Sequence, residues 1–268
     1  FAEKLAKHGN CYVNDAFGAA HRAHASTTQL ASFFPNDKMA GLLMNAEIEN
    51  AKKVLHEAER PFTAIVGGAK VSDKVLIVEN LLQIANHIII GGGMAYTFFK
   101  AMGGQIGASL CEEERVDTCK EILARAKTMG VQIHLPVDAI VADRFAAVAN
   151  TKIANSGEIE ANWMGLDIGP KAIETFRAVL LDSKTILWNG PMGVFEMPAF
   201  EAGTKNIAMA VAEATANGAF SLIGGGDSAA AVQQFNLSSK VSYVSTGGGA
   251  LLEYFEGKTL PGVQALEA

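Results

Sequence analysis

Three consecutive glycines followed by an acid are the first residues here whose types and order could do chemistry. Residues 220–232 read FSLIGGGDSAAAV, in which an apolar run suited to a short buried strand leads into the glycines, and a segment suited to a helix starts at Ser228. Backbone N–H groups without side chains could approach an anion at the positive end of that helix. Asp227 would repel a phosphate unless it capped the helix or held a cation, which suggests a metal–nucleotide site.

Two lysines follow another glycine turn. In GGAKVSDK, residues 67–74, Lys70 and Lys74 lie four residues apart on the predicted opening turns of a helix, so both ammonium groups would point to one side. Such charges at the positive end of a helix are unfavourable unless a polyanion relieves them. A solvated helix face with Asp73 as partner, worth about 1 kcal/mol or less, also fits. We favour the phosphate interpretation.

The segment WNGPMGVFE, residues 188–196, has two explanations. Glu196 could accept hydrogen bonds from ribose hydroxyls while Pro191 and Val194 pack against a base. The segment could equally be an ordinary loop between a strand and a helix.

The segment DAFGAAHRAHAS, residues 15–26, also has two explanations. Arg22 and its neighbouring histidines could bind an anion or lie in a solvated loop.

Two known nucleotide motifs are incomplete. GKT at residues 257–259 ends like a P-loop, but Leu252 stands at the position of the first glycine of that motif. The glycines and Ala229 fit G-x-G-x-x-A of dinucleotide-binding folds, yet the next predicted strand runs into Ser245 and Thr246 instead of the acid that binds a ribose. An NAD-dependent dehydrogenase is therefore the second choice.

The elements that must position these residues alternate between apolar runs and helical stretches. Runs without polar alternation are typical of strands covered on both faces, which predicts an α/β fold with a doubly wound, mostly parallel, Rossmann-like sheet in three α/β/α layers. Glycines follow most of these runs, and open α/β sheets bind ligands at the carboxyl ends of their strands, so we expect one crevice. The predicted strands are residues 62–66, 87–90, 132–141, 185–188, 220–223 and 241–244.

Other segments complete the expected organisation. Residues 38–59 have the spacing of one long amphipathic helix that could connect two lobes. Residues 145–163 predict a polar surface excursion, and residues 164–170 a turn.

Composition excludes several classes of protein. The formal net charge of −6 at pH 7 argues against a nucleic-acid surface. The sequence has no apolar window long enough to cross a bilayer, so no membrane partner is expected. The three cysteines lack the spacing of a disulfide framework or a zinc site and fit a reducing cytoplasm.

Taken together, the motifs resemble the phosphoglycerate kinase family. GGAKVSDK, GGGMAYTF, WNGPMGVFE, GGGDSAAAV and STGGGALLEYFEGKTLPG occur in this order, and DAFGAAHRAHAS resembles the loop near the end of the family's amino-terminal domain. The resemblance covers essentially the whole chain. It implies a glycolytic, monomeric enzyme that transfers a phosphoryl group reversibly between 1,3-bisphosphoglycerate and ADP, with Mg²⁺ bound to ADP or ATP.

The resemblance also implies roles for individual residues. Lys70 would lie against the phosphoryl group in flight, and Gly248 and Gly249 would face that group. Arg22 would help to hold the phosphoglycerate, and Asp227 would bind the magnesium ion. The residues implied to bind the nucleotide are Gly68, Lys74, Gly92, Gly93, Gly165, Leu166, Asn189, Pro191, Val194, Glu196, Gly225, Gly226, Asp227 and Ser228, the last standing where many members have Thr.

The implied domain organisation is incomplete at its start. Residues 1–37 would be a remnant of the amino-terminal substrate lobe, 38–60 the interdomain helix, 61–256 the nucleotide-binding domain, and 257–268 a tail returning toward the first lobe. The first part of the family's chain is missing, and with it the basic residues that bind the acid substrate. We therefore expect this chain alone to bind nucleotide but to catalyse weakly or not at all. A noncatalytic nucleotide-binding fragment is the alternative.

Overall fold

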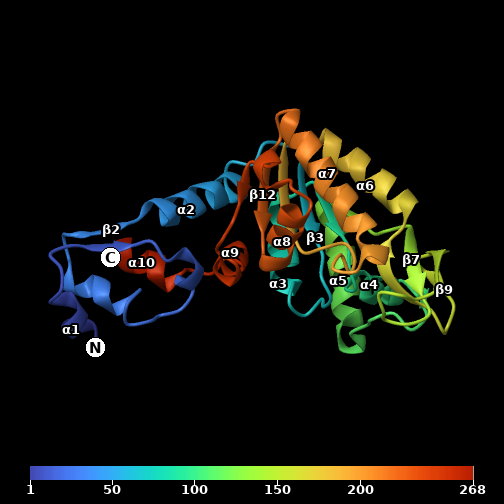
Figure 1. Cartoon of the computed structure of the whole chain (residues 1–268), viewed down its shortest axis with the longest axis horizontal. Coiled ribbons are helices and arrows are strands. Elements are labelled where there is room, and N and C mark those ends of the chain that lie inside the picture. Colours follow the sequence, from blue (N-terminus) through green and yellow to red (C-terminus); the bar gives the residue numbers. More distant parts are fainter. Residues whose placement is uncertain (268) are drawn as a thin grey trace.

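The computed structural model describes residues 1–267 and shows a small lobe and a large lobe joined by one long helix (Figure 1). The small lobe contains the amino-terminal residues and helix α10 (Pro261–Glu267), so the first and last described residues both lie in it. The connecting helix is α2 (Leu42–Leu55). Among the described residues, no helix is long and apolar enough to span a membrane.

A parallel sheet of six strands forms the centre of the large lobe, which confirms the predicted doubly wound α/β fold. Side chains alternate along each strand, so Ala64 packs in one hydrophobic core and Ile65 in the other, and both are fully buried. This explains why the strands lack polar alternation. In sheet order the strands are β13 (Tyr243–Val244), β12 (Phe220–Gly224), β11 (Thr185–Asn189), β3 (Phe62–Val66), β4 (His87–Ile90) and β6 (Gln132–His134).

Helices cover both faces of this sheet and complete the three layers. Apolar stripes such as Ile77, Val78 and Leu81 in one helix face the strands, and the opposite side of that helix is more exposed. The helices on one face are α3 (Val75–Ile84), α4 (Ala95–Ala101), α5 (Val116–Met129) and α9 (Gly249–Phe255), and those on the other are α6 (Pro170–Asp182), α7 (Ala202–Ala216) and α8 (Gly226–Gln234) (Figure 1).

The sequence prediction for residues 132–170 is wrong in three places. The single strand predicted at residues 132–141 is two strands in different sheets, because Pro136 between them has no N–H to continue a ladder. The predicted surface excursion contains strands, and the predicted turn at 164–170 is mostly a strand. A second, antiparallel sheet results, in the order β10 (Met164–Ile168), β7 (Asp138–Ala142), β8 (Thr151–Asn155), beside the short pair β5 (Gln105–Ile106) and β9 (Glu158–Ile159).

The connecting helix is shorter than the predicted span of residues 38–59. Residues Lys38–Ala40 form strand β2, which pairs in parallel with β1 (Tyr12–Asn14) of the small lobe. The helix starts after Gly41, where the Asp15 carboxylate accepts a hydrogen bond of 2.8 Å from the Met44 N–H. A capping side chain 29 residues away in the sequence leaves no local signal of this start.

The end of the chain packs against the small lobe. The Gly262 N–H donates to the Ala20 carbonyl at 2.8 Å, and the Asn14 amide donates to the Gly262 carbonyl at 3.3 Å. The lobe also contains α1 (Ala2–Ala6) and two short 3-10 helices, η1 (Phe17–Ala19) and η2 (Gln29–Phe33). Of the predicted tail at residues 257–268, residue 268 lies outside the described residues.

Candidate functional site

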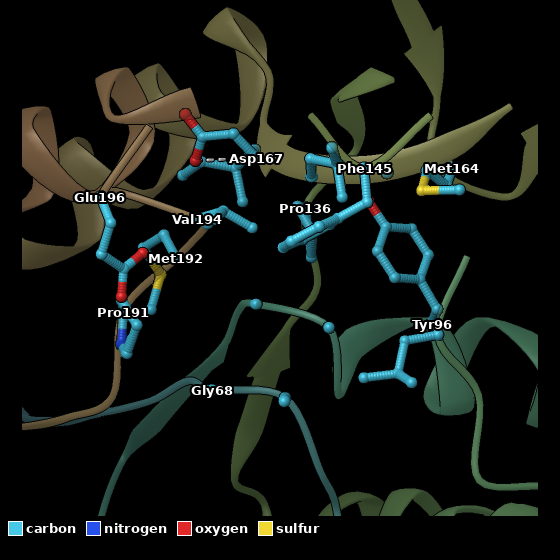
Figure 2. A pocket seen from close by; sticks show the side chains of 18 of the residues that line it. Gly68, Tyr96, Pro136, Phe145, Met164, Asp167, Pro191, Met192, Val194 and Glu196 are labelled. Carbon is cyan, nitrogen blue, oxygen red and sulfur yellow. Dashed lines mark hydrogen bonds between the residues drawn. The ribbon is translucent and has the colours of Figure 1, made fainter. Parts of the chain in front are cut away.

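A cavity of about 490 Å³ opens at the carboxyl edge of the central sheet (Figure 2). Loops that follow β3, β4 and β11 meet there through backbone hydrogen bonds: the Gly68 N–H donates to the Pro191 carbonyl, and the Gly92 N–H to the Met192 carbonyl, each at 3.1 Å. Gly92 has a φ of 68°, and a Cβ there would overlap the Gly68 carbonyl. Glycine is required for this approach, as the repeated glycines after the strands indicated.

Many of the residues predicted to bind a nucleotide line this one cavity, although they come from separate parts of the chain. Figure 2 shows Gly68 on one side of it, opposite Val194, Pro136 and Phe145. The predicted residues among its lining are Gly68, Gly92, Gly93, Gly165, Leu166, Pro191, Val194, Glu196 and Asp227.

Sequence reasoning missed much of the apolar wall. Tyr96 from α4, Leu110, Pro136 and Met164 line the cavity, and so does Phe145, whose side chain is 61% exposed. Two signals were available: Tyr96 lies within the motif GGGMAYTF, and Phe145 is an aromatic residue at the start of a polar segment. Pro136 and Met164 lie in segments that were predicted as a strand and a turn. Together the missed residues make one wall apolar, as the face of a nucleobase requires.

Two ionisable groups of the cavity lining, Tyr96 and Asp167, are buried. The Tyr96 hydroxyl lies against Gly165, and burial, followed by the nearby Asp167 carboxylate, raises the pKa of Tyr96. Asp167 is 2% exposed, and burial raises its pKa to about 7 against hydrogen bonds from the Gly203 and Ile168 N–H groups, which lower it.

Lys74 is fixed by a buried amide at the edge of the sheet. The Lys74 ammonium donates to Asn189 Oδ1, and the Asn189 amide donates in turn to the Gly224 carbonyl at 2.8 Å. Asn189 is 2% exposed, and both its polar atoms are used in this chain of bonds. Burial lowers the pKa of Lys74, while Asp73, Asp227 and Glu256 act to raise it. Asn189 therefore fixes the position of the ammonium group.

The sequence predicted that Lys70 and Lys74 lie on the opening turns of a helix, but in the structure both precede the helix. α3 starts only at Val75, so Lys74 is the residue that precedes the helix, and Lys70 lies in the loop before it. Glu112, which lies 40 residues further along the chain than Ser72, fixes this loop. The Ser72 N–H and hydroxyl donate to its two carboxylate oxygens at 3.0 and 2.6 Å. Lys70 is exposed and follows Ala69, which lines the cavity.

The glycine-rich segment after β12 leads into α8 two residues earlier than predicted. Gly225 precedes the helix with a φ of 90°, and Gly226 and Asp227 are exposed in its first turn, where backbone N–H groups lack acceptors within the helix. Ser228 points inward and is fully buried, and its hydroxyl accepts a hydrogen bond of 2.6 Å from the Gly190 N–H. The Ser228 hydroxyl is therefore directed at the loop that follows β11.

The donor set around α8 suits a magnesium ion that arrives with a nucleotide. Within residues 1–267 there is no group of three or more His, Cys, Asp or Glu side chains that could hold a metal by themselves. Mg²⁺ commonly binds one or two protein carboxylates together with substrate phosphates, and the exposed Asp227 carboxylate meets that requirement.

The remaining predicted residues form a second group at the junction with the small lobe. Gly248, with a φ of 50°, precedes α9, and Gly249 opens it. A Cβ at Gly249 would lie 3.7 Å from His21 Nε2, and His21 is adjacent to Arg22 in the sequence. Arg22 and these glycines thus come from elements that pack together, but they do not line the cavity.

The fold and this edge of the sheet define a doubly wound α/β protein with a ligand crevice at the carboxyl ends of its strands. The chain belongs to the phosphoglycerate kinase family, since the family model described as Phosphoglycerate kinase matches residues 1–258. This confirms the resemblance seen in the motifs.

Individual relatives agree with the family. The chain is 57% identical over 268 residues to a phosphoglycerate kinase of Porphyromonas gingivalis, covering all of this chain and 64% of the relative. The structure of phosphoglycerate kinase from Coxiella burnetii superposes with a TM-score of 0.94 at 43% identity, and that from Pyrococcus horikoshii OT3 with 0.84 at 32% identity. Each comparison covers 99% of this chain, but only 67% and 65% of the two solved chains. The chain thus spans about two thirds of the length of these relatives.

Proposed function

We propose that this chain is the nucleotide-binding part of an enzyme that transfers a phosphoryl group between 1,3-bisphosphoglycerate and ADP, giving 3-phosphoglycerate and ATP. The observation that carries the proposal is the continuity between an apolar cavity, which suits adenosine, and the adjoining cationic edge of Lys74 and α8, which suits phosphates. Glu196 on the cavity wall is the acceptor for ribose hydroxyls, and Asp227 lies where the cavity meets α8.

Phosphoryl transfer relies on positioning and on neutralisation of charge, and the residues present supply both. Asn189 holds the Lys74 ammonium toward the phosphates, and the exposed amides of Gly226 and Asp227 supply donors. Lys70, on the loop beside the cavity, is placed to approach the phosphoryl group in transfer. Magnesium bound with the nucleotide would neutralise further phosphate charge, and Asp227 is the carboxylate that would hold it.

We assign Arg22 to the phosphoglycerate, and Gly248 and Gly249 at the start of α9 to the phosphoryl group in transfer. The segment before α9 is held by Glu47 of α2, whose carboxylate accepts hydrogen bonds from the Ser245 hydroxyl at 2.6 Å and the Thr246 N–H at 2.7 Å. This arrangement also weighs against the dehydrogenase. A dehydrogenase would need a free acid at the end of β13 to bind a ribose. Ser245 and Thr246 follow β13 instead, and both donate hydrogen bonds to the Glu47 carboxylate.

Calorimetry separates the candidate ligands. The chain should bind Mg-ADP and not NAD, and Lys74→Met should weaken Mg-ADP binding, whereas Lys120→Met should leave it unchanged, because Lys120 pairs with Asp117 at 2.8 Å on exposed α5. NAD binding without Mg-ADP binding would overturn the proposal.

The noncatalytic alternative needs a second measurement. ATP formation from 1,3-bisphosphoglycerate should be weak or absent with this chain alone, and should rise when the amino-terminal lobe of the P. gingivalis relative is supplied in trans. A chain that binds Mg-ADP and stays inactive in that mixture is a noncatalytic nucleotide-binding fragment. We propose a monomeric state in the cytoplasm, which size-exclusion chromatography and cell fractionation would check.

A further inference from the structure

A buried carboxyl group, that of Asp167, belongs to the lining of the nucleotide cavity, and none of the roles above uses it. Asp167 belongs to β10, two residues after Gly165, and Figure 2 shows it on the far side of Val194 from Gly68. Buried carboxyl groups are costly unless they are hydrogen-bonded, so the contacts that Asp167 makes should explain its presence.

Asp167 joins β10 to helix α7. One carboxylate oxygen, Oδ2, accepts a hydrogen bond of 2.7 Å from the Gly203 N–H in the first turn of α7, and Oδ1 accepts one of 2.9 Å from the Ile168 N–H. The Gly203 N–H has no acceptor within its own helix, so the carboxylate caps it. On this observation alone Asp167 would be a helix cap and nothing more.

Asp167 also touches the loop that forms one wall of the cavity. A Cβ at Gly193 would overlap Asp167 Oδ1 and would lie 2.7 Å from the Asp167 Cα, so the loop at residues 191–196 approaches the carboxyl as closely as a glycine allows. Two hydrogen bonds secure the same loop: the Val194 N–H donates to the Leu166 carbonyl at 2.9 Å, and the Met192 N–H to Thr204 Oγ1 of α7 at 3.0 Å.

An irregularity in β10 lies at the same place. The pairing with β7 shifts between Gly165 and Asp167, so Leu166 is an extra residue in the ladder. Such bulges redirect the strand locally. Here Leu166 lines the cavity, its carbonyl receives the Val194 N–H, and Asp167 turns toward α7.

We propose that Asp167 is a positioning residue that holds the loop at residues 191–196 between β10 and α7, and thereby sets the width of the slot between Leu166 and Val194 that receives the nucleoside. This inference rests on the proposed function, because it assumes that the cavity takes the adenosine part of a nucleotide. Asp167 is 2% exposed, and the proposal gives it no contact of its own with the nucleotide.

The test compares Asp167→Asn with a matched buried acid. Asp138 of β7 is also 2% exposed and also caps a helix, accepting hydrogen bonds from the Lys171 and Ala172 N–H groups of α6, but it does not line the cavity. Calorimetry should show adenosine and Mg-ADP binding weakened about tenfold or more by Asp167→Asn, pyrophosphate binding changed less than twofold, and no such selectivity with Asp138→Asn. Gly193→Ala, which disturbs the same contact from the loop side, should repeat the selective loss if Asp167→Asn folds poorly.

Amide hydrogen exchange provides a readout that needs no ligand. Exchange at Val194 should accelerate in Asp167→Asn and stay unchanged in Asp138→Asn. If the wild type binds no Mg-ADP, the proposed function fails, and the Val194 exchange rate still decides the positioning role. Wild-type Mg-ADP binding together with unchanged adenosine affinity in Asp167→Asn and Gly193→Ala would overturn the inference, as would equal effects of Asp167→Asn and Asp138→Asn.

Discussion

Replacement of Asn189 by leucine tests the link between the central sheet and Lys74, the lysine that we propose binds the nucleotide phosphates. Leucine keeps the branching of the side chain at Cγ but can neither accept from Lys74 nor donate to the Gly224 carbonyl. The change therefore removes two hydrogen bonds at a position that is 2% exposed, while β11 keeps its backbone pairing.

The expected magnitudes follow from these contacts. A buried carbonyl left without a donor costs about 1–3 kcal/mol, and the lost bond to the ammonium group adds about 1 kcal/mol, because half-buried Lys74 can turn to water. The free energy of unfolding in urea titrations should fall by about 2–4 kcal/mol. Mg-ADP affinity should fall about tenfold, or about 1.4 kcal/mol, since Lys74 is no longer held toward the phosphates.

Asn80→Leu is the matched control. Asn80 also donates to a backbone carbonyl, that of Phe255 at 3.1 Å, but lies away from the cavity. This variant should lose stability and keep its Mg-ADP affinity. In a Lys74→Met background, Asn189→Leu should weaken binding little further, because both changes remove the same interaction. Full Mg-ADP affinity in Asn189→Leu, or additive losses in the double variant, would refute the reasoning.

Three further changes test other parts of the site. Lys70→Ala in the complete enzyme should lower turnover about 10²-fold or more in steady-state kinetics, and unchanged turnover would remove Lys70 from the mechanism. Burial raises the pKa of Asp167 from 3.8 to about 7, so between these pH values the folded chain keeps a proton that the unfolded chain releases. The unfolding free energy of the wild type minus that of Asp167→Asn should therefore fall as the pH rises from about 4 to about 7. A difference that does not change with pH would contradict this. Ser228→Ala leaves the Gly190 N–H without its acceptor and should lower the unfolding free energy by about 1–3 kcal/mol in urea titrations, whereas an unchanged value would show that another group accepts this bond.

Local sequence patterns were sufficient to predict those elements whose physical cause is itself local. Strands covered on both faces have no alternative to continuous apolar residues, so the runs at residues 62–66 and 87–90 could be recognised without any knowledge of their neighbours. Glycines after those strands indicated a crevice because a side chain there would block the approach of neighbouring backbone, as Gly92 and Gly68 show. The candidate residues of the cavity followed from these two patterns and from the family motifs.

Features that depend on distant partners could not be predicted in the same way. The start of α2 depends on Asp15, and β10 exists because β7 pairs with it, although its own residues, MGLDI before a glycine and a proline, read as a turn. The hydrogen bond from the Gly190 N–H to the Ser228 hydroxyl likewise joins residues 38 positions apart, so nothing in the sequence indicated it.

By itself the sequence determined the α/β class, the crevice at the carboxyl edge of the sheet, and the family, because these depend on residue types and on their order along the chain. Only the tertiary structure decided which groups meet: Lys74 with Asn189, and Asp167 with the loop around Gly193. These partners lie far apart in the sequence, so their distances, burial and charge come into being only when the sheets and helices pack. The FSLIGGGDSAAAV segment shows both: its glycines and acid predicted an anion site, and packing decided that Asp227 is exposed and Ser228 is buried against Gly190.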